Sequence, residues 1–265
     1  MTHQRLIPAT CALTLLLLTT LPAHATTFWN EGFEFADNAA WLANGTGWGP
    51  SACTPAGHNN ILEISSERAF LGTKSLKYTF VGFLPANVAN VTCYIDRFYP
   101  LSSEVYTRRY VFLSGFTSQS PGTKLVFLGE TAYVNFWEFF EGTNNVLKMN
   151  AQGSTLGGNG QIWSFGPVPS ARWVCIETHI KYNTSGVSDG VLEGWMDGVQ
   201  RFSRSDMFFN AANQTGRFRQ LRLYRQHGTG VMYVDELAIG NTRIGCLGTQ
   251  TDRTPPSTPS NFVVN

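Results

Sequence analysis

Hydrophobic and polar residues alternate along much of this chain, in short segments separated by glycine, asparagine, aspartate and serine. The clearest alternation runs through residues 173–182. Its apolar positions are Val174, Ile176 and Ile180, and its polar positions are Glu177, His179 and Lys181. Successive side chains of a β-strand point to opposite faces of the sheet, so this segment predicts a strand with one buried face and one polar face.

The next segment, 191–199, repeats the pattern. Leu192 and Met196 share one face, and Glu193, Trp195 and Asp197 share the other. If the two segments form a hairpin with both apolar sets in the core, His179 lies opposite either Glu193 or Trp195. The dipeptide Asp197-Gly198 is a tight-turn signal that ends the second strand.

About ten segments have the composition of strands, because they are rich in Val, Ile, Phe, Tyr and Thr and lack helical periodicity. They are residues 75–81, 91–98, 105–113, 124–128, 133–140, 146–150, 173–182, 191–199, 218–225 and 231–239. The 26 glycines and the 13% of aromatic residues agree with this. The pattern predicts an all-β fold, an antiparallel β-sandwich of the jelly-roll kind.

The two ends of the chain differ from this β-rich middle. Residues 1–25 predict a secretory signal peptide, with Arg5, an apolar stretch from Ala12 to Leu18, and the cleavage pattern Ala23-His24-Ala25. The sandwich domain is expected over residues 26–248, and 249–265 form a Pro/Ser/Thr-rich linker or tail. No later stretch approaches the ~20 apolar residues of a membrane span. We therefore expect a secreted or periplasmic protein.

The charge balance argues against one class of partner. The full chain has 19 Lys and Arg against 18 Asp and Glu, and the leader holds only Arg5, so the mature chain has 18 of each. Nucleic-acid binding relies on a net basic surface, and is not expected as the main function. Nucleophile-elbow, phosphate-loop, dinucleotide and HExxH motifs are also absent from the sequence, and Gly157-Gly158-Asn159-Gly160 is typical of a flexible loop.

The mature chain contains four cysteines, because Cys11 of the original five belongs to the leader. An even number in an oxidising compartment predicts two disulfides, and the wide spacing does not fit a metal knuckle. We expect Cys53–Cys93, which ties an early loop to a nearby strand, and Cys175–Cys246, which anchors the chain end beside a central strand.

Three segments together resemble a known family. Residues 172–184 and 188–198 contain, in order, a Trp, the alternating strand, Asn-Thr, Asp-Gly, a second strand and Trp-x-Asp-Gly. This hairpin resembles that of concanavalin A-like polysaccharide lyases, notably alginate and glucuronan lyase relatives. Residues 104–110 resemble their arginine-bearing strand, and 122–125 their glycine-lysine segment. A similar hairpin also occurs in non-catalytic laminin G-like sandwiches.

The resemblance implies β-elimination on an acidic, uronate-containing polysaccharide. This reaction needs the sugar carboxylate neutralised, a base for the C5 proton and a proton for the leaving oxygen. Arg108 or Arg109, with Lys124, would neutralise the carboxylate, and His179 would be the base. The proton would come from Tyr110, Tyr133 or Tyr182. Arg108, Lys124 and His179 must then converge on one groove; alternatively, His179 is a polar-face residue paired with Glu177 or Glu193.

Other residues are candidates for binding the sugar chain. Aromatic rings stack on the apolar faces of sugars, and the possible platforms are Trp137, Trp163, Trp195 and Tyr224, unless they are buried in the core. Glu177, Lys181 and Tyr133 are the polar candidates for substrate contacts. The basic residues Arg217, Arg219, Arg222 and Arg225 would attract an anionic polymer, or form a solvated strand face.

A second resemblance links the two ends of the predicted domain. Residues 30–34 and 233–237 are similar to the paired end strands of carbohydrate-binding β-sandwich modules, which often share a structural Ca²⁺. The resemblance implies that Glu34 and Asp235 would hold this ion, unless they are solvated edge residues. No other cofactor is required. The competing functions are therefore a polysaccharide lyase, a non-catalytic carbohydrate-binding or adhesion module, and a structural protein without a glycan ligand.

Overall fold

The computed structural model describes residues 27–43, 45–49, 52–54, 62–81, 92–119, 122–129, 134–153, 161–209 and 217–248. The expected signal peptide and the Pro/Ser/Thr-rich tail lie outside these residues, as do Tyr133 and the Gly157–Gly160 loop. Within the described part of the chain, no helix is long and apolar enough to cross a membrane.

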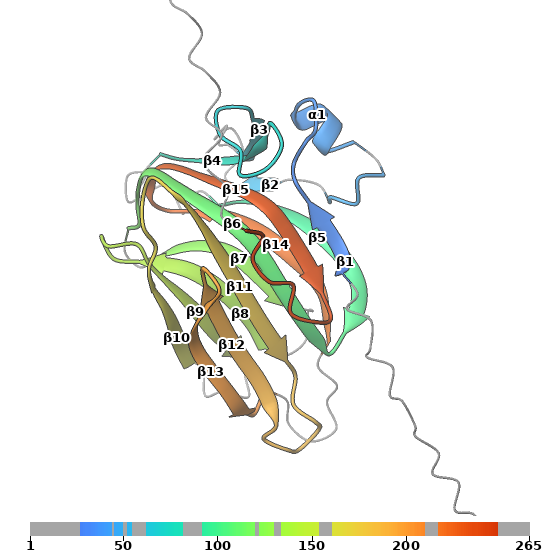
Figure 1. Cartoon of the computed structure of the whole chain (residues 1–265). Coiled ribbons are helices and arrows are strands. Elements are labelled where there is room, and N and C mark those ends of the chain that lie inside the picture. The colour runs from blue at the N-terminus through green and yellow to red at the C-terminus, as the bar shows by residue number, and fades with distance from the viewer. Residues whose placement is uncertain are drawn as a thin grey trace, which may run out of the picture.

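Two antiparallel sheets form the domain, as predicted (Figure 1). Sheet A has the strand order β13-β12-β11-β6-β15-β4-β3, with β1 paired to β15. Its strands are β1 (Thr27–Glu31), β3 (Leu62–Ser65), β4 (Ser75–Val81), β6 (Glu104–Thr117), β11 (Trp173–Lys181), β12 (Gly190–Met196), β13 (Val199–Met207) and β15 (Thr229–Gly240). A short helix, α1 (Asn38–Trp41), follows β1 and is capped by the Asp37 side chain.

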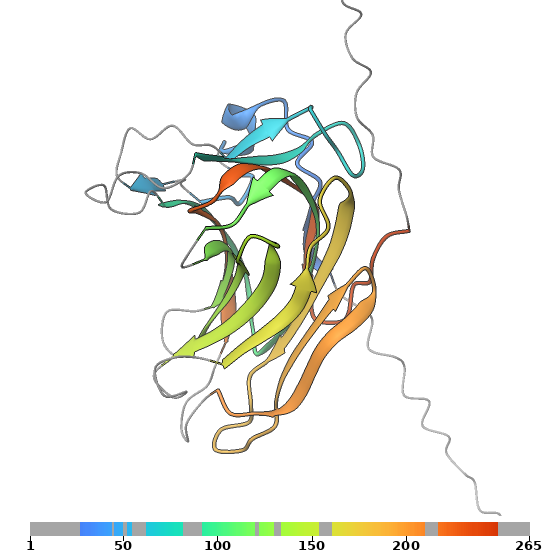
Figure 2. The same cartoon turned by 90° about the vertical axis from the view of Figure 1, so that its left-hand side faces the viewer.

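Sheet B has the order β10-β9-β8-β7-β14-β5-β2. Its strands are β2 (Ala52–Thr54), β5 (Thr92–Ser102), β7 (Thr123–Gly129), β8 (Val134–Glu141), β9 (Val146–Gly153), β10 (Gln161–Pro167) and β14 (Phe218–Gln226). Figure 2 shows the two layers, with green to yellow-green β7, β8 and β9 in one and gold to orange β11, β12 and β13 in the other.

The inner faces of the sheets carry the apolar residues that the alternation assigned to the core. Val174, Ile176 and Ile180 of β11 are fully buried, as is Leu192 of β12. Burial of such side chains contributes about 1.5–3 kcal/mol each, which favours this register over one shifted by a single residue.

The predicted hairpin is formed by β11 and β12, and its register places His179 opposite Glu193 rather than Trp195. The turn after β12 contains Asp197 with φ 52° and Gly198 with φ 76°. Two successive left-handed residues match the right-handed twist of a tight hairpin, which explains the Asp-Gly sequence. The strand predicted over 191–199 therefore ends at Met196, and Val199 begins β13.

Four strands escaped the sequence prediction: β2, β3, β10 and β13. They are the edges of the two sheets, whereas β1 pairs with β15 near Leu237, as the second resemblance implied. Edge strands are often short or polar, because this prevents pairing with other chains. In β13, for example, seven of nine residues are exposed, so no alternation marks it.

Candidate functional site

A buried ion pair between the sheets shows which side chains of β6 and β8 point into the core and which point outward. Arg109 of β6 and Glu138 of β8 are 1% and 0% exposed, and their side chains form an ion pair across the core. Thr178 of β11 donates a 2.7 Å hydrogen bond to the other Glu138 oxygen. Because neighbours in a strand alternate, Arg108 points out from sheet A and Trp137 points out from sheet B.

His179 lies on the outer face of sheet A, and both of its ring nitrogens are occupied. Nδ1 is 2.8 Å from Glu193 Oε2, and Nε2 is 2.8 Å from Glu104 Oε1. The ring stacks on Tyr106 at 3.8 Å and is 5% exposed. With a carboxylate on each nitrogen, neither nitrogen is open to accept a proton from a sugar. The geometry therefore matches the alternative of a polar-face histidine, with Glu193 as one partner.

Burial and hydrogen bonds act in opposite directions on Glu193. Partial burial raises its pKa, but hydrogen bonds from His179 and Ser203, together with that of Gln200, outweigh this effect and lower it. Ser203 Oγ and Gln200 Nε2 donate to Oε1 at 2.9 and 3.2 Å. The carboxylate thus joins β11, β12 and β13 at the outer surface of sheet A.

Residues 241–248 cross the outer face of sheet A (deep red in Figure 1). This segment covers other residues that were predicted to form the site. Glu177 is 2% exposed, and it accepts hydrogen bonds from Arg243 Nη2 at 2.8 Å and from the Gly245 backbone at 2.9 Å. Arg243 also lies 4.4 Å above the ring of Trp195, which is 6% exposed. Neither Glu177 nor Trp195 is therefore open to a polymer.

Two more candidates on this face are also engaged. Arg108 donates to the Glu236 backbone carbonyl at 3.2 Å and pairs with its carboxylate at 3.5 Å. The Tyr110 hydroxyl donates to Leu247 O at 2.8 Å, and burial raises the pKa of Tyr110 to about 12. Tyr182, the alternative proton donor, is buried against Phe218 in the core. Only Lys181 remains exposed.

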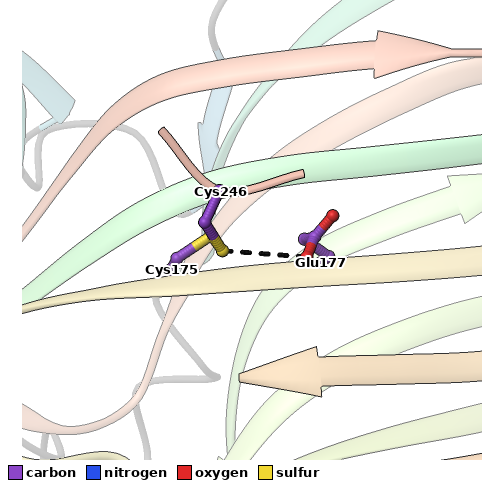
Figure 3. A group of neighbouring side chains, drawn as sticks. All are labelled: Cys175, Glu177 and Cys246. Carbon is purple, nitrogen blue, oxygen red and sulfur yellow. Dashed lines mark hydrogen bonds between the residues drawn. A yellow bond between two sulfur atoms is a disulfide. The ribbon is translucent and has the colours of Figure 1, made fainter. Parts of the chain in front are cut away.

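The disulfide Cys175–Cys246 holds this segment in place, as predicted, with the two Cα atoms 6.0 Å apart (Figure 3). Glu177 Oε2 lies 3.7 Å from Cys246 Sγ. These three residues have the spacing of a metal site, but sulfurs joined in a disulfide are not thiolate ligands. The register of β2 and β5 puts Cys53 opposite Cys93. Their side chains lie outside the described part, so that disulfide stays a prediction.

A cavity of 420 Å³ lies beside the same disulfide. Its walls include Phe70, Tyr110 and Trp173, and Arg172 and Asp197 form an ion pair at 2.7 Å along its lining. The charged groups at this cavity are thus already paired with each other.

The groove expected from the family resemblance is not formed. Lys124 of β7 pairs in register with Phe139, and its ammonium lies 4.3 Å above the ring of outward-facing Trp137. Lys124 is therefore on the outer face of sheet B, whereas Arg108 and His179 are on the outer face of sheet A. The full thickness of the sandwich separates Lys124 from Arg108 and His179. The predicted mechanism, in which these three residues act on one sugar, is therefore wrong.

The outer face of sheet B carries a row of aromatic rings, all of them half-buried. They are Trp137 of β8, Phe127 of β7, Tyr224 of β14 and Tyr94 of β5. Ring centroids are 4.7 Å apart for Phe127–Trp137, 5.0 Å for Trp137–Tyr224 and 5.8 Å for Tyr94–Tyr224. The row crosses four neighbouring strands, and partly exposed rings of this kind are suited to stacking on successive sugars.

Basic side chains flank this aromatic row. Arg222 of β14 forms a bidentate pair with Asp96, with Nη2 2.7 Å from Oδ2, and lies 4.0 Å above Tyr94. Its Nη1 is 3.4 Å from the Tyr224 hydroxyl. The bonds with Asp96 raise the pKa of Arg222, whereas burial lowers that of Lys124. Among the described residues, no carboxylate forms an ion pair with Lys124.

Sequence reasoning had named Trp137, Tyr224, Lys124 and Arg222 separately, and missed Phe127, Tyr94 and Asp96. The alternation in 218–225 held the signal for this face, since Arg222 and Tyr224 share one side of a strand whose other side is Leu221 and Leu223. The other basic residues do not join them as a face: Arg225 turns inward, and Arg219 lies 5.6 Å from exposed Phe98. Trp163 packs against the core.

The two residues predicted to bind Ca²⁺ hold opposite ends of one loop. Asp235 accepts hydrogen bonds from the backbone of Phe70 and Leu71, and Glu34 accepts them from Thr73 and Lys74. No set of three or more ligand residues includes either carboxylate among the described residues. Because Ca²⁺ also takes backbone oxygens as ligands, the ion stays a prediction. An unchanged melting temperature with EDTA and with excess Ca²⁺ would refute it.

No protein-family model matches this chain, and no curated protein matches its sequence. Its structure is similar to that of an endo-β-1,4-glucuronan lyase from the fungus Trichoderma reesei, with 17% identity, TM-score 0.58, and 82% of this chain and 96% of that one covered. The cellulose-induced protein Cip1 is similar over 83% and 100% of the two chains, with 16% identity and TM-score 0.56.

A third structure extends the likeness to alginate lyases. The PL-14 alginate lyase from Aplysia kurodai matches with 15% identity, TM-score 0.53, and 82% and 100% of the two chains covered. Identities at this level show the fold. This chain therefore has the jelly-roll fold of polysaccharide lyases.

Proposed function

We propose that this protein is exported and acts on an acidic polysaccharide at the outer face of sheet B, cleaving it by β-elimination. The observation that carries the proposal is the aromatic row, with half-buried rings from four adjacent strands and basic groups beside them. Polysaccharide lyases of the same fold support a reaction of this class, and the disulfide agrees with export.

Tyr224 is the group on this face best suited to move a proton. Its hydroxyl lies 3.4 Å from Arg222 Nη1, and Asp96 fixes the position of that guanidinium. In the proposed reaction Tyr224 takes the proton from C5 of a uronate. The electron pair then forms the C4–C5 double bond, the C4–O4 bond breaks, and the leaving oxygen receives the same proton back from the Tyr224 oxygen, which returns to its starting state.

The test combines two measurements on the full mature chain. Turnover is followed by the ultraviolet absorbance of unsaturated uronate on polyglucuronate and alginate, and binding by affinity electrophoresis. Tyr224→Phe should abolish product while binding stays within about twofold, because the phenol acts in the transition state. Trp137→Ala should instead weaken binding by about 10-fold, since one stacking platform is lost.

A non-catalytic carbohydrate-binding module is the second candidate. It is favoured by the separation of the predicted catalytic groups onto two faces. Binding without unsaturated product from the unmutated protein would select this function. The absence of binding to any uronate polymer would refute both.

A further inference from the structure

The cavity beside the Cys175–Cys246 disulfide lies on the outer side of sheet A, near the start of β11. Its volume of 420 Å³ falls within the range of about 300–1,000 Å³ that is usual for small-molecule pockets. The residues that line it include Phe70, Tyr110, Arg172, Trp173, Asp197 and Leu247. The full thickness of the sandwich separates this cavity from the aromatic row on sheet B, so the two features are independent of each other.

Most of the cavity wall is apolar. Phe70 stacks on Tyr110 with ring centroids 3.6 Å apart, and it packs edge-to-face against Trp173 at 6.0 Å. All three rings belong to one buried cluster on this side of sheet A, and the disulfide drawn in Figure 3 continues the wall. Because these groups already pack against one another, the wall keeps its shape without a ligand, and little ordering is needed on binding.

The charged groups at the cavity form a pair that can still make hydrogen bonds. Arg172 donates from Nη2 to Asp197 Oδ2 at 2.7 Å and from Nη1 to the Trp173 carbonyl at 3.1 Å. Asp197 Oδ1 accepts from the Cys175 backbone at 3.0 Å. These bonds fix both side chains, which remain 50% and 37% exposed. A guanidinium has more N–H donors, and a carboxylate more lone pairs, than these bonds use.

This combination selects among classes of ligand. A purely apolar molecule would cover the partly exposed pair and offer nothing to its free donors and acceptors, which is costly. An anion would face the Asp197 carboxylate, and a cation the Arg172 guanidinium, so neither gains a net attraction from the two opposite charges. A neutral sugar satisfies both parts of the cavity, because it has apolar C–H faces for the rings and hydroxyl groups that donate and accept hydrogen bonds.

We propose that this cavity binds a neutral sugar of mono- or disaccharide size. Its apolar face lies toward the aromatic wall, and its hydroxyl groups bond to Arg172 and Asp197. The protein would thus hold a neutral glycan on the side of sheet A that faces away from the acidic polymer on sheet B. This site requires no β-elimination, so it stands whether or not the protein is a lyase.

The test uses three pairs of methyl glycosides that differ only at C6. They are those of glucose, galactose and mannose, each compared with the glycoside of its uronic acid. Binding to the full mature chain is followed by NMR of the tryptophan indole N–H signals, and the Trp173 signal is the one missing from the Trp173→Phe variant. At least one neutral glycoside should shift this signal without shifting that of Trp137, and should bind about 10-fold or more tightly than its uronate.

Three variants test the charge pair. Arg172→Met should weaken the neutral glycoside by about 10-fold, because hydrogen bonds from a charged donor are lost. Asp197→Asn leaves the guanidinium unpaired, so the uronate should bind at least as tightly as the neutral sugar; Asn tolerates the φ of 52° at this position. Arg204→Met is the matched control, since Arg204 forms a similar exposed pair with Asp206 on β13 but does not line the cavity.

Four results would overturn the site. They are the absence of a Trp173 shift with all three neutral glycosides, a shift of Trp137 in its place, equal binding of neutral sugar and uronate by the unmutated protein, and an equal effect of Arg172→Met and Arg204→Met. Failure of the lyase assay would leave the site in place, because the two proposals concern opposite faces of the sandwich.

Discussion

The buried pair of Arg109 and Glu138 gives the sharpest prediction of stability. Glu138→Gln keeps the size of the side chain and an oxygen for the Thr178 hydroxyl, but it removes the negative charge that faces Arg109. Both groups are at most 1% exposed, so water cannot replace the lost partner. The variant therefore tests the cost of an uncompensated charge in the core.

Breaking a buried ion pair by removing one partner costs about 3–5 kcal/mol, which is a large share of the ~5–15 kcal/mol that stabilises a typical domain. For a domain of this size the melting temperature should fall by roughly 6–20 °C. Urea unfolding of the mature, disulfide-bonded protein, followed by tryptophan fluorescence, measures the free energy directly.

A double variant, Arg109→Met with Glu138→Leu, separates charge from packing. Apolar replacement of a whole buried pair is often nearly neutral, so the double variant should be more stable than Glu138→Gln alone. A loss below about 1 kcal/mol for Glu138→Gln would refute the reasoning. A double variant less stable than Glu138→Gln would show instead that side-chain packing, rather than charge compensation, determines the cost.

Two further predictions concern other buried groups. Cys246→Ser should lower the free energy of unfolding, measured in urea, by about 4 kcal/mol, because Cys175–Cys246 closes a loop of 71 residues. Non-reducing peptide mapping should also find the second disulfide, Cys53–Cys93. A free thiol at either of these two cysteines would contradict that pairing. Asp235 is 0% exposed, and burial raises its pKa to about 8. The folded protein therefore keeps this proton where the unfolded chain has lost it, so stability should fall as pH rises from about 4 to 8. Asp235→Asn should be less sensitive to pH between 5 and 8 in urea unfolding, and an equal slope would contradict this assignment.

The fold was largely predictable from sequence. When one face of a strand is buried, apolar and polar residues alternate along it, and this alternation identifies the central strands. The segment 173–182 is an example, since its three apolar positions are all fully buried. Edge strands such as β13 carry no such constraint and were missed. Alternation left two possible registers for β11 and β12, with His179 opposite either Glu193 or Trp195. The structure has His179 opposite Glu193.

The candidate site was less predictable, because alternation separates inward from outward positions but does not say which sheet an outward residue belongs to. His179 and Lys124 both occupy outward positions, yet β11 and β7 belong to different sheets. The partners of His179 come from β12 and from Glu104, which is 75 residues away in the chain. Such contacts depend on strand order, which local sequence patterns do not contain.

The two outer faces differ in what their polar residues do. On sheet A, residues 241–248 lie across the strands, and Glu177 and Cys175 hold them there. The outward positions of β11 are buried, except for Lys181 at its end. On sheet B, the rings around Tyr224 remain half-buried, and Lys124 has no acidic partner among the described residues. A patch of partly exposed rings often marks an interaction site, and a cation beside it attracts an anionic ligand. A polymer with apolar sugar faces and regularly spaced carboxylates would satisfy both features at once, which is why the outer face of sheet B is the better candidate.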